Sequence, residues 1–140
     1  MKTRTLPSHP DPALPAALRA AALGLNCLTA AVQLIIGNAT WLHREDFTTR
    51  FIQHLDTGID GYELAEIDWA GAITALDAGQ LPCSSGEQHM LRLAASIAAG
   101  TPVSLQDALT RLDATNIDLL TTAIWHAAGQ PPPTATLTID

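Results

Sequence analysis

The chain has 140 residues, of which 47% are hydrophobic, and a formal net charge of −7. This length suits one domain that buries roughly two thirds of its unfolded surface, and the hydrophobic content excludes an intrinsically disordered chain. Aromatic residues make up only 4%, while Ala, Leu and Thr are abundant, which favours helices over sheets. We therefore predict an all-α, single-domain bundle of five or six helices around a central apolar N-terminal helix.

The first predicted helix follows a proline-rich start. Residues 1–14 contain three prolines and are expected to form a flexible arm. Apolar residues then recur at helical spacing from Pro15 to Ile36, and Gly37-Asn38 is a typical helix end. The helix is apolar around most of its circumference, so we expect the other helices to pack around it.

The uncharged stretch over residues 20–37 also bears on location. Its eighteen residues are at the lower limit for crossing a bilayer, but polar residues such as Asn26 and Gln33 favour a buried core helix. The chain has two cysteines, Cys27 and Cys83, too few for a disulfide framework, and Cys27 is expected to be a small core residue. A cytoplasmic protein without membrane contact is therefore expected.

The middle of the chain combines a predicted helix with a loop. Phe47, Phe51 and Leu55 follow one another at four-residue spacing, which predicts a helix over about residues 40–55. The next stretch, residues 56–68, contains two glycines and is expected to be the least regular part of the interior.

Five acidic side chains fall in this loop. Its first six residues, 56–61, are similar to the opening of an EF-hand calcium loop. Calcium takes six to eight oxygen ligands, usually including a bidentate Glu at the twelfth loop position, where this chain has Ile67. We keep Asp56, Asp60 and Glu66 as candidate Ca²⁺ ligands beside the simpler interpretation of an acidic surface loop, and expect no other cofactor.

Capping side chains predict the remaining helices. Ser84 and Glu87 form a capping box, in which each side chain bonds the backbone amide of the other residue. In the last helix Ile117 and Ile124 are in register with the apolar positions between them and are expected to face the core. The other caps are Asp68, Ser104 and Asp113, and the helix ends are Gly79, Gly100 and Gly129. The helical domain thus spans residues 15–129, followed by a flexible tail over 130–140.

Charge along the chain limits its partners. Residues 1–50 carry five basic and three acidic side chains, whereas residues 51–140 carry two basic and eleven acidic ones. An acidic surface repels phosphate backbones and anionic membranes, and it suits a cationic partner or bound cations. The alternative is a solvated acidic face that maintains solubility. Nucleic acid and membranes are therefore not expected as partners.

The last three predicted helices, over residues 84–129, have the lengths of a helix-turn-helix unit. DNA affinity depends on neutralising phosphates, and residues 113–129 contain no Lys or Arg. A compact three-helix packing unit therefore fits better. A helix-turn-helix-like DNA-binding regulator is the alternative function.

No recognisable catalytic motif is present. The sequence has no metal-protease helix, paired-Cys motif, phosphate loop or Ser/His/Asp signature, and Cys83 before a helix start would need a base within reach to act as a nucleophile. We predict no catalytic residues. Trp41, Trp69 and Trp125 are candidate partner-binding residues, with a structural role in the core as the competing interpretation.

Three segments of the chain stand out beside its nearly Lys-free composition: Ile67-Asp68-Trp69 and the runs 76–83 and 91–96. Together they resemble small uncharacterised α-helical proteins of high-GC actinobacteria. The resemblance implies a family and attaches no activity to it.

The sequence therefore favours a non-enzymatic protein–protein interaction module. Such a small adaptor or regulator would bind another protein, or itself as a homodimer, through helix faces. The alternatives are the DNA-binding regulator and a cation-binding module that uses the loop over residues 56–68.

Overall fold

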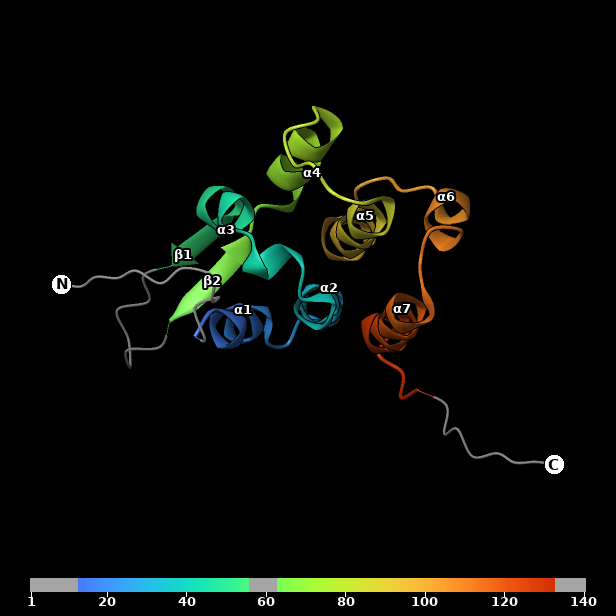
Figure 1. The fold of residues 1–140 in the computed structure, drawn as a ribbon. Helices are drawn as coiled ribbons and strands as arrows, with labels where there is room; N and C mark the ends of the chain where they lie inside the picture. Colours follow the sequence, from blue (N-terminus) through green and yellow to red (C-terminus); the bar gives the residue numbers. More distant parts are fainter. Residues whose placement is uncertain (1–12, 56–62, 133–140) are drawn as a thin grey trace.

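The computed structural model describes residues 13–55 and 63–132, which form one mainly helical domain (Figure 1). In this part of the chain it has seven α-helices and one pair of short strands. In chain order the elements are α1 (Leu14–Ala22), α2 (Asn26–Asn38), the 3₁₀-helix η1 (Trp41–His43), α3 (Glu45–Phe51), β1 (Ile52–Leu55), β2 (Leu64–Ile67), α4 (Trp69–Asp77), α5 (Ser85–Ala99), α6 (Leu105–Leu109) and α7 (Ala114–Ala127). The predicted all-α, single-domain class is confirmed, with more helices than the five or six expected. The predicted arm and tail lie largely outside the described residues.

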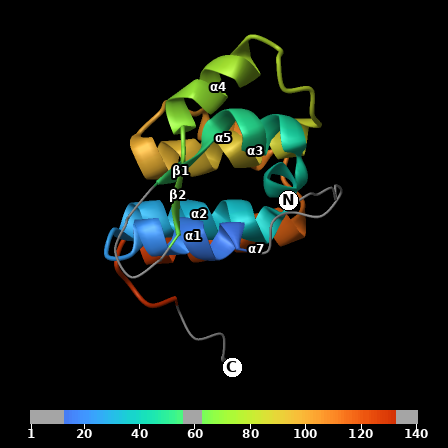
Figure 2. The same cartoon turned by 90° about the vertical axis from the view of Figure 1, so that its left-hand side faces the viewer.

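The helices lie in two tiers. Figure 2 shows α1, α2 and α7 together in the lower tier, with α3 and α5 above them and α4 on top. The two-stranded sheet lies at one end, where β2 contacts α1. Helix α2 makes its main contacts with α5 above it and α7 beside it, so it is the centre of the domain.

Small residues on α2 let neighbouring helices approach it closely. Ala30 and Ala31 are completely buried. At Gly37 a β-carbon would lie 2.6 Å from a methyl carbon of Leu119, so the glycine lets α7 lie close against α2. Interiors are close-packed, so a larger residue at position 37 would require the Leu119 side chain to shift.

The predicted single helix from Pro15 to Ile36 is wrong. The chain breaks at Gly24, whose φ of +86° belongs to the left-handed region that other residues rarely adopt. The carbonyl oxygen of Ala22 accepts hydrogen bonds from the Leu25 amide at 3.0 Å and the Thr29 hydroxyl at 2.8 Å, which satisfies the end of α1. Helix α2 alone takes the central place, and α1 turns back to cover the sheet.

The helix predicted over residues 40–55 is also wrong in part. After η1, α3 ends at Phe51 and the chain enters β1, which pairs antiparallel with β2 and places Ile52 opposite Ile67. Over the four residues of β1, the apolar pattern fits a helix as well as a strand. Pairing with β2 makes this segment a strand. The second half of the expected acidic loop is likewise a strand.

The cap predictions are confirmed. Ser84 and Glu87 make both bonds of the capping box, at 3.2 and 2.9 Å. Asp68, Ser104 and Asp113 each accept from a backbone amide three residues on, and Gly100 adopts a left-handed conformation after α5. These bonds satisfy amides that a helix leaves without partners at its start.

Helices α5, α6 and α7 do not close into the expected three-helix packing unit. Helix α6 packs on α5, whereas α7 packs on α2. A hydrogen bond of 2.9 Å from the side-chain amide of Asn38 to Asn116 fixes α7 against the end of α2. The outer sides of α6 and α7 are left without a covering helix in the described part of the chain.

Candidate functional site

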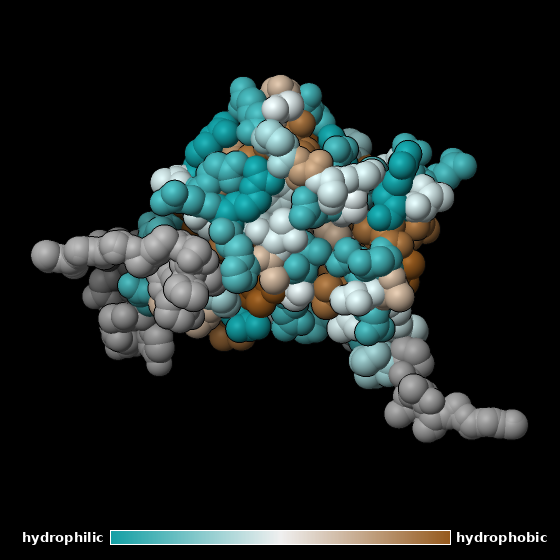
Figure 3. All heavy atoms as spheres, viewed as in Figure 1, coloured by the Kyte–Doolittle hydropathy of each residue, from teal (hydrophilic) through white to brown (hydrophobic). Residues whose placement is uncertain are grey.

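The outer sides of α6 and α7 carry the main cluster of exposed apolar side chains. We call this cluster the α6–α7 surface and define it by Leu105, Leu109, Ile117 and Ile124, which are 42–56% exposed. In Figure 3 brown, hydrophobic atoms gather on the right-hand side of the molecule, over these two helices. Isolated exposed apolar residues are ordinary, but a cluster on two consecutive helices marks a candidate interaction site.

Helical spacing explains why these four side chains face outwards. Leu105 and Leu109 are one turn apart on α6, and Ile117 and Ile124 are two turns apart on α7. The neighbouring positions on the same helices face the core: Ala108, Leu120 and Ala123 are buried. The expectation that Ile117 and Ile124 face the core is therefore wrong. The apolar face of α7 is wider than the part of it that α2 covers. Ile117 and Ile124 lie on the part of this face that α2 leaves uncovered.

The sequence contained a signal for this surface. Five apolar positions in α7 span more than one face, and the adjoining short helix has two large apolar residues beside its buried alanine, Ala108. Helical periodicity predicts that the α7 stripe faces the core, and that periodicity does not single out Leu105 or Leu109. An excess of apolar positions over what one neighbouring helix can cover would have identified them.

Acidic groups border the α6–α7 surface. Asp113 caps α7 one turn before Ile117, and Asp118 directly follows Ile117 and is exposed. Asp107 is also exposed, but helical spacing places it on the side of α6 opposite Leu105 and Leu109. Helix α7 has no Lys or Arg, and Arg111 is the basic side chain in the link before it. This charge distribution disfavours phosphate backbones, since DNA binding depends on basic contacts.

A second group of polar residues surrounds Arg44. The guanidinium donates two hydrogen bonds to the Asp46 carboxylate, at 2.9 and 2.6 Å, and one of 2.7 Å to the Pro82 carbonyl oxygen. It also lies 4.7 Å from the centre of the Trp41 ring, a cation–π distance. The paired hydrogen bonds raise the pKa of Arg44 and lower the pKa of Asp46. Each of the three guanidinium nitrogens donates a hydrogen bond inside the chain, so the role of Arg44 is to join α3 to the segment before α5.

Cys83 lies beside this group but is not an activated nucleophile. The thiol is partly buried, and burial raises its pKa, an effect to which Glu87 adds and which the nearby arginines oppose. A thiol with a raised pKa stays protonated near neutral pH and reacts slowly. The other cysteine, Cys27, is exposed on α2, which corrects its expected place in the core.

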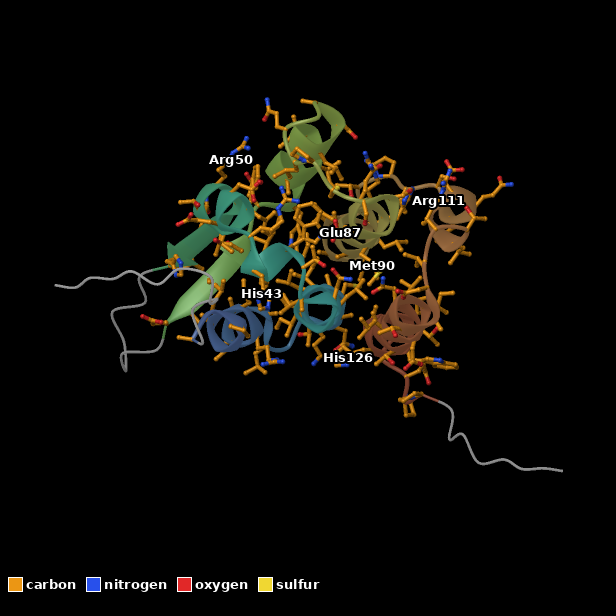
Figure 4. The ribbon with its side chains drawn as sticks, viewed as in Figure 1. His43, Arg50, Glu87, Met90, Arg111 and His126 are labelled. Atoms are coloured by element: carbon orange, nitrogen blue, oxygen red, sulfur yellow. The ribbon has the colours of Figure 1, made fainter. Side chains whose placement is uncertain are left out.

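Outside the Arg44 group, the histidines and the other labelled arginines lie apart in the described part of the chain. Figure 4 shows that Arg50 on α3 and Arg111 beyond α6 lie on opposite sides of the molecule, and that His43 and His126 come from different elements. His89 is bonded through Nδ1 to the Ser85 carbonyl oxygen, 2.8 Å away, within its own helix. Acid–base catalysis needs groups within hydrogen-bond reach of one another, and these side chains are spread over the fold.

The candidate calcium ligands are only partly placed. Glu66 is exposed on β2, and Asp56 and Asp60 lie outside the described residues. Across residues 13–55 and 63–132, no three His, Cys, Asp or Glu side chains come together as a metal site. The calcium site stays a prediction.

The three tryptophans have different surroundings. Trp41 is completely buried, and its Nε1–H donates to the Glu87 carbonyl oxygen at 3.0 Å. Trp69 is 7% exposed at the start of α4, and Trp125 is half-buried on α7. Trp41 and Trp69 thus use most of their surface inside the chain, and Trp125 retains part of its ring for an outside contact.

Comparisons with other proteins add no family. No protein-family model matches the chain, and comparison with curated proteins and with solved structures gives no significant match. The resemblance to actinobacterial proteins stays a prediction. Among the helices that the structure describes, none has both the length and the apolar character needed to cross a membrane.

Proposed function

We propose that the chain is a non-enzymatic protein–protein interaction module, a small adaptor or regulator, that binds a protein partner through the α6–α7 surface. The observation that carries this proposal is the exposure of Leu105, Leu109, Ile117 and Ile124, each at least 42%, on two consecutive helices. Large apolar side chains in water cost free energy that burial against a partner recovers.

The charge around the surface defines the chemistry of the partner. Asp113 and Asp118 border Ile117 on α7, and the whole chain carries a net charge of −7. A partner that presents an apolar helix face flanked by Lys or Arg would match both features. A second copy of this chain matches less well, since its exposed α7 face is also acidic. Self-association is therefore the alternative outcome of the test.

The size of the surface suits a transient complex. Complete burial of one Leu or Ile side chain is worth roughly 1.5–3 kcal/mol, so the exposed halves of four such side chains supply about 4 kcal/mol. Association costs at least a similar amount in lost translational and rotational freedom. Polar contacts at the acidic border must therefore add to the affinity.

The free thiols support a reducing compartment such as the cytoplasm for this module. Cys27 and Cys83 are both unpaired. Disulfides are characteristic of oxidising compartments, whereas free cysteines persist where thiols are kept reduced.

Capture experiments with matched variants test the proposal. In the test variant Leu105, Leu109, Ile117 and Ile124 are replaced by Ser. In the control, two other exposed leucines, Leu23 and Leu25 at the α1–α2 turn, are replaced by Ser. Immobilised proteins are incubated with lysate of the source organism, bound proteins are quantified by mass spectrometry, and a purified partner is titrated by calorimetry.

We expect a basic partner that the wild type and the control retain and that the test variant loses, with an affinity at least tenfold weaker. Sedimentation of the wild type and both variants examines self-association in parallel. A wild-type dimer that only the test variant dissociates would identify the partner as a second copy. Equal capture by the two variants, both with unchanged far-UV circular dichroism, would contradict the proposal.

A further inference from the structure

A cavity lies where α1, α2 and β2 meet, on the opposite side of α2 from α7. Its volume is about 230 Å³. The walls are apolar: Leu18 and Ala21 come from α1, Leu28 and Val32 from α2, and Trp69 from the start of α4. In Figure 1 this is the region at the lower left, where the strand β2 passes over α1. The cavity is separate from the α6–α7 surface and from the Arg44 group.

The edge of β2 contributes polar backbone groups to this cavity. The Asp68 amide donates to the Phe51 carbonyl oxygen at 2.7 Å, just beyond the Ile52–Ile67 pair. In an antiparallel ladder this bond makes Ile52–Ile67 a non-hydrogen-bonded pair. The N–H and C=O groups of Ala65 and Ile67 therefore turn away from β1, and both residues line the cavity.

These backbone groups are buried without a visible partner. Ala65 is 1% and Ile67 7% exposed, and no hydrogen bond to their backbone groups comes from elsewhere in residues 13–55 and 63–132. Buried backbone amides and carbonyls are nearly always hydrogen-bonded, to protein, to ordered water or to a ligand. The cavity therefore combines an apolar body with a short row of hydrogen-bonding groups along one side.

Glu66 is the one charged residue among the described residues that line the cavity. It pairs with Gln53 across the ladder, and side chains alternate between the two faces of a strand. Its exposed side chain therefore projects from the face opposite Ala65 and Ile67. A charged ligand would lose its hydration without a compensating charge, so the site selects a neutral one.

We propose that this cavity binds a small, neutral, mostly apolar molecule that carries one hydroxyl or amide group, which bonds the backbone of Ala65 or Ile67. The size fits, because a cavity of about 150 Å³ lined by apolar side chains accepts benzene. The larger volume here admits an aromatic ring with a polar substituent. Ligand sites in general have this composition, with apolar walls and a few placed polar groups that fix orientation.

Titration with phenol, followed by ¹⁵N–¹H NMR, tests the proposal. Phenol has an aromatic body and a hydroxyl that can both donate and accept. The reporters are the backbone amides of Ala65 and Ile67 and the indole Nε1–H of Trp69, while the indole signal of Trp41, already bonded to the Glu87 carbonyl oxygen, is the internal reference. Toluene, of the same size but without a polar group, is the second probe.

Two variants of α1 complete the design. Ala21→Leu fills the cavity, whereas Ala16→Leu adds the same side chain at an exposed position of the same helix. We expect saturable shifts at the three reporters in the wild type and in Ala16→Leu, their loss in Ala21→Leu, and about fivefold weaker binding of toluene, the worth of one hydrogen bond.

Several outcomes would overturn the proposal. Shifts that rise linearly with phenol concentration would mean that phenol does not bind in the cavity, and that ordered water alone hydrogen-bonds these backbone groups. Equal saturable shifts in Ala21→Leu, with melting temperatures showing that both variants are folded, would place phenol elsewhere. Binding of toluene as tight as that of phenol would remove the hydrogen bond to β2 from the proposal.

Discussion

Replacement of Trp41 by Phe tests how the two tiers are joined. The indole is completely buried, its Nε1–H donates to the Glu87 carbonyl oxygen of α5, and its ring centre lies 5.4 Å from that of Phe47. Loss of one buried hydrogen bond costs about 1 kcal/mol. The smaller ring gives up contacts and leaves a cavity, which adds roughly 1–2 kcal/mol. We therefore expect the free energy of unfolding to fall by about 2–3 kcal/mol, which lowers Tm by on the order of 10 °C.

Urea denaturation followed by far-UV circular dichroism measures this effect without relying on tryptophan fluorescence. The matched control is Trp125→Phe, since Trp125 is only half-buried and lies at the edge of α7. We expect the control to lose about 1 kcal/mol or less. If the two variants are destabilised equally, the argument that Trp41 ties η1 to α5 is refuted.

Three further predictions concern other contacts. Ser84→Ala removes half of the capping box and should lower the free energy of unfolding by about 1 kcal/mol, measured by urea denaturation; no loss would contradict the role of the cap. Asp46 has a lowered pKa in the folded state, so it contributes stability above the ordinary aspartate pKa that disappears as the pH falls through the folded value. Urea titrations between pH 5 and 2 should therefore show a steeper loss for the wild type than for Asp46→Asn, and parallel curves would refute this. Cys27 is exposed and Cys83 has a raised pKa, so a thiol reagent at pH 7.5 should label Cys27 first by mass spectrometry; the reverse order would be inconsistent with the burial of Cys83.

The helix boundaries that depend on local chemistry could be predicted from the sequence. Ser84, Ser104 and Asp113 each bond an amide three residues away, and this interaction involves only neighbours in the chain. Capping patterns can therefore be identified without knowledge of the tertiary structure. The same holds for Gly100, whose left-handed conformation ends α5.

The errors concern features that depend on distant parts of the chain. Gly24 lies inside a continuous apolar pattern, and nothing local separates a tolerated helical glycine from one that breaks the helix. The break becomes favourable because α1 then packs against β2, forty residues away in the sequence. Residues 52–55 become a strand for the same reason, since β1 exists only through its pairing with β2.

The α6–α7 surface was missed because amphipathic patterns do not show which apolar positions are covered. Ile117 and Leu120 are equally apolar in the sequence, but α2 covers only Leu120. The cavity beside β2 could not be predicted from the sequence either, since its walls come from four separate elements. Both features depend on how much surface each neighbouring helix can cover.

Amide hydrogen exchange of the native protein tests the central claim most directly, namely that α2 is the core helix and that α7 packs on it with its outer face uncovered. The slowest exchange should occur over residues 30–36 of α2, with protection of α5 and α7 close behind. Helix α6 and the α1–α2 turn at Gly24 should exchange fastest among the described elements. Continuous strong protection from residue 15 through 36, or slow exchange in α7 with α2 unprotected, would contradict this account.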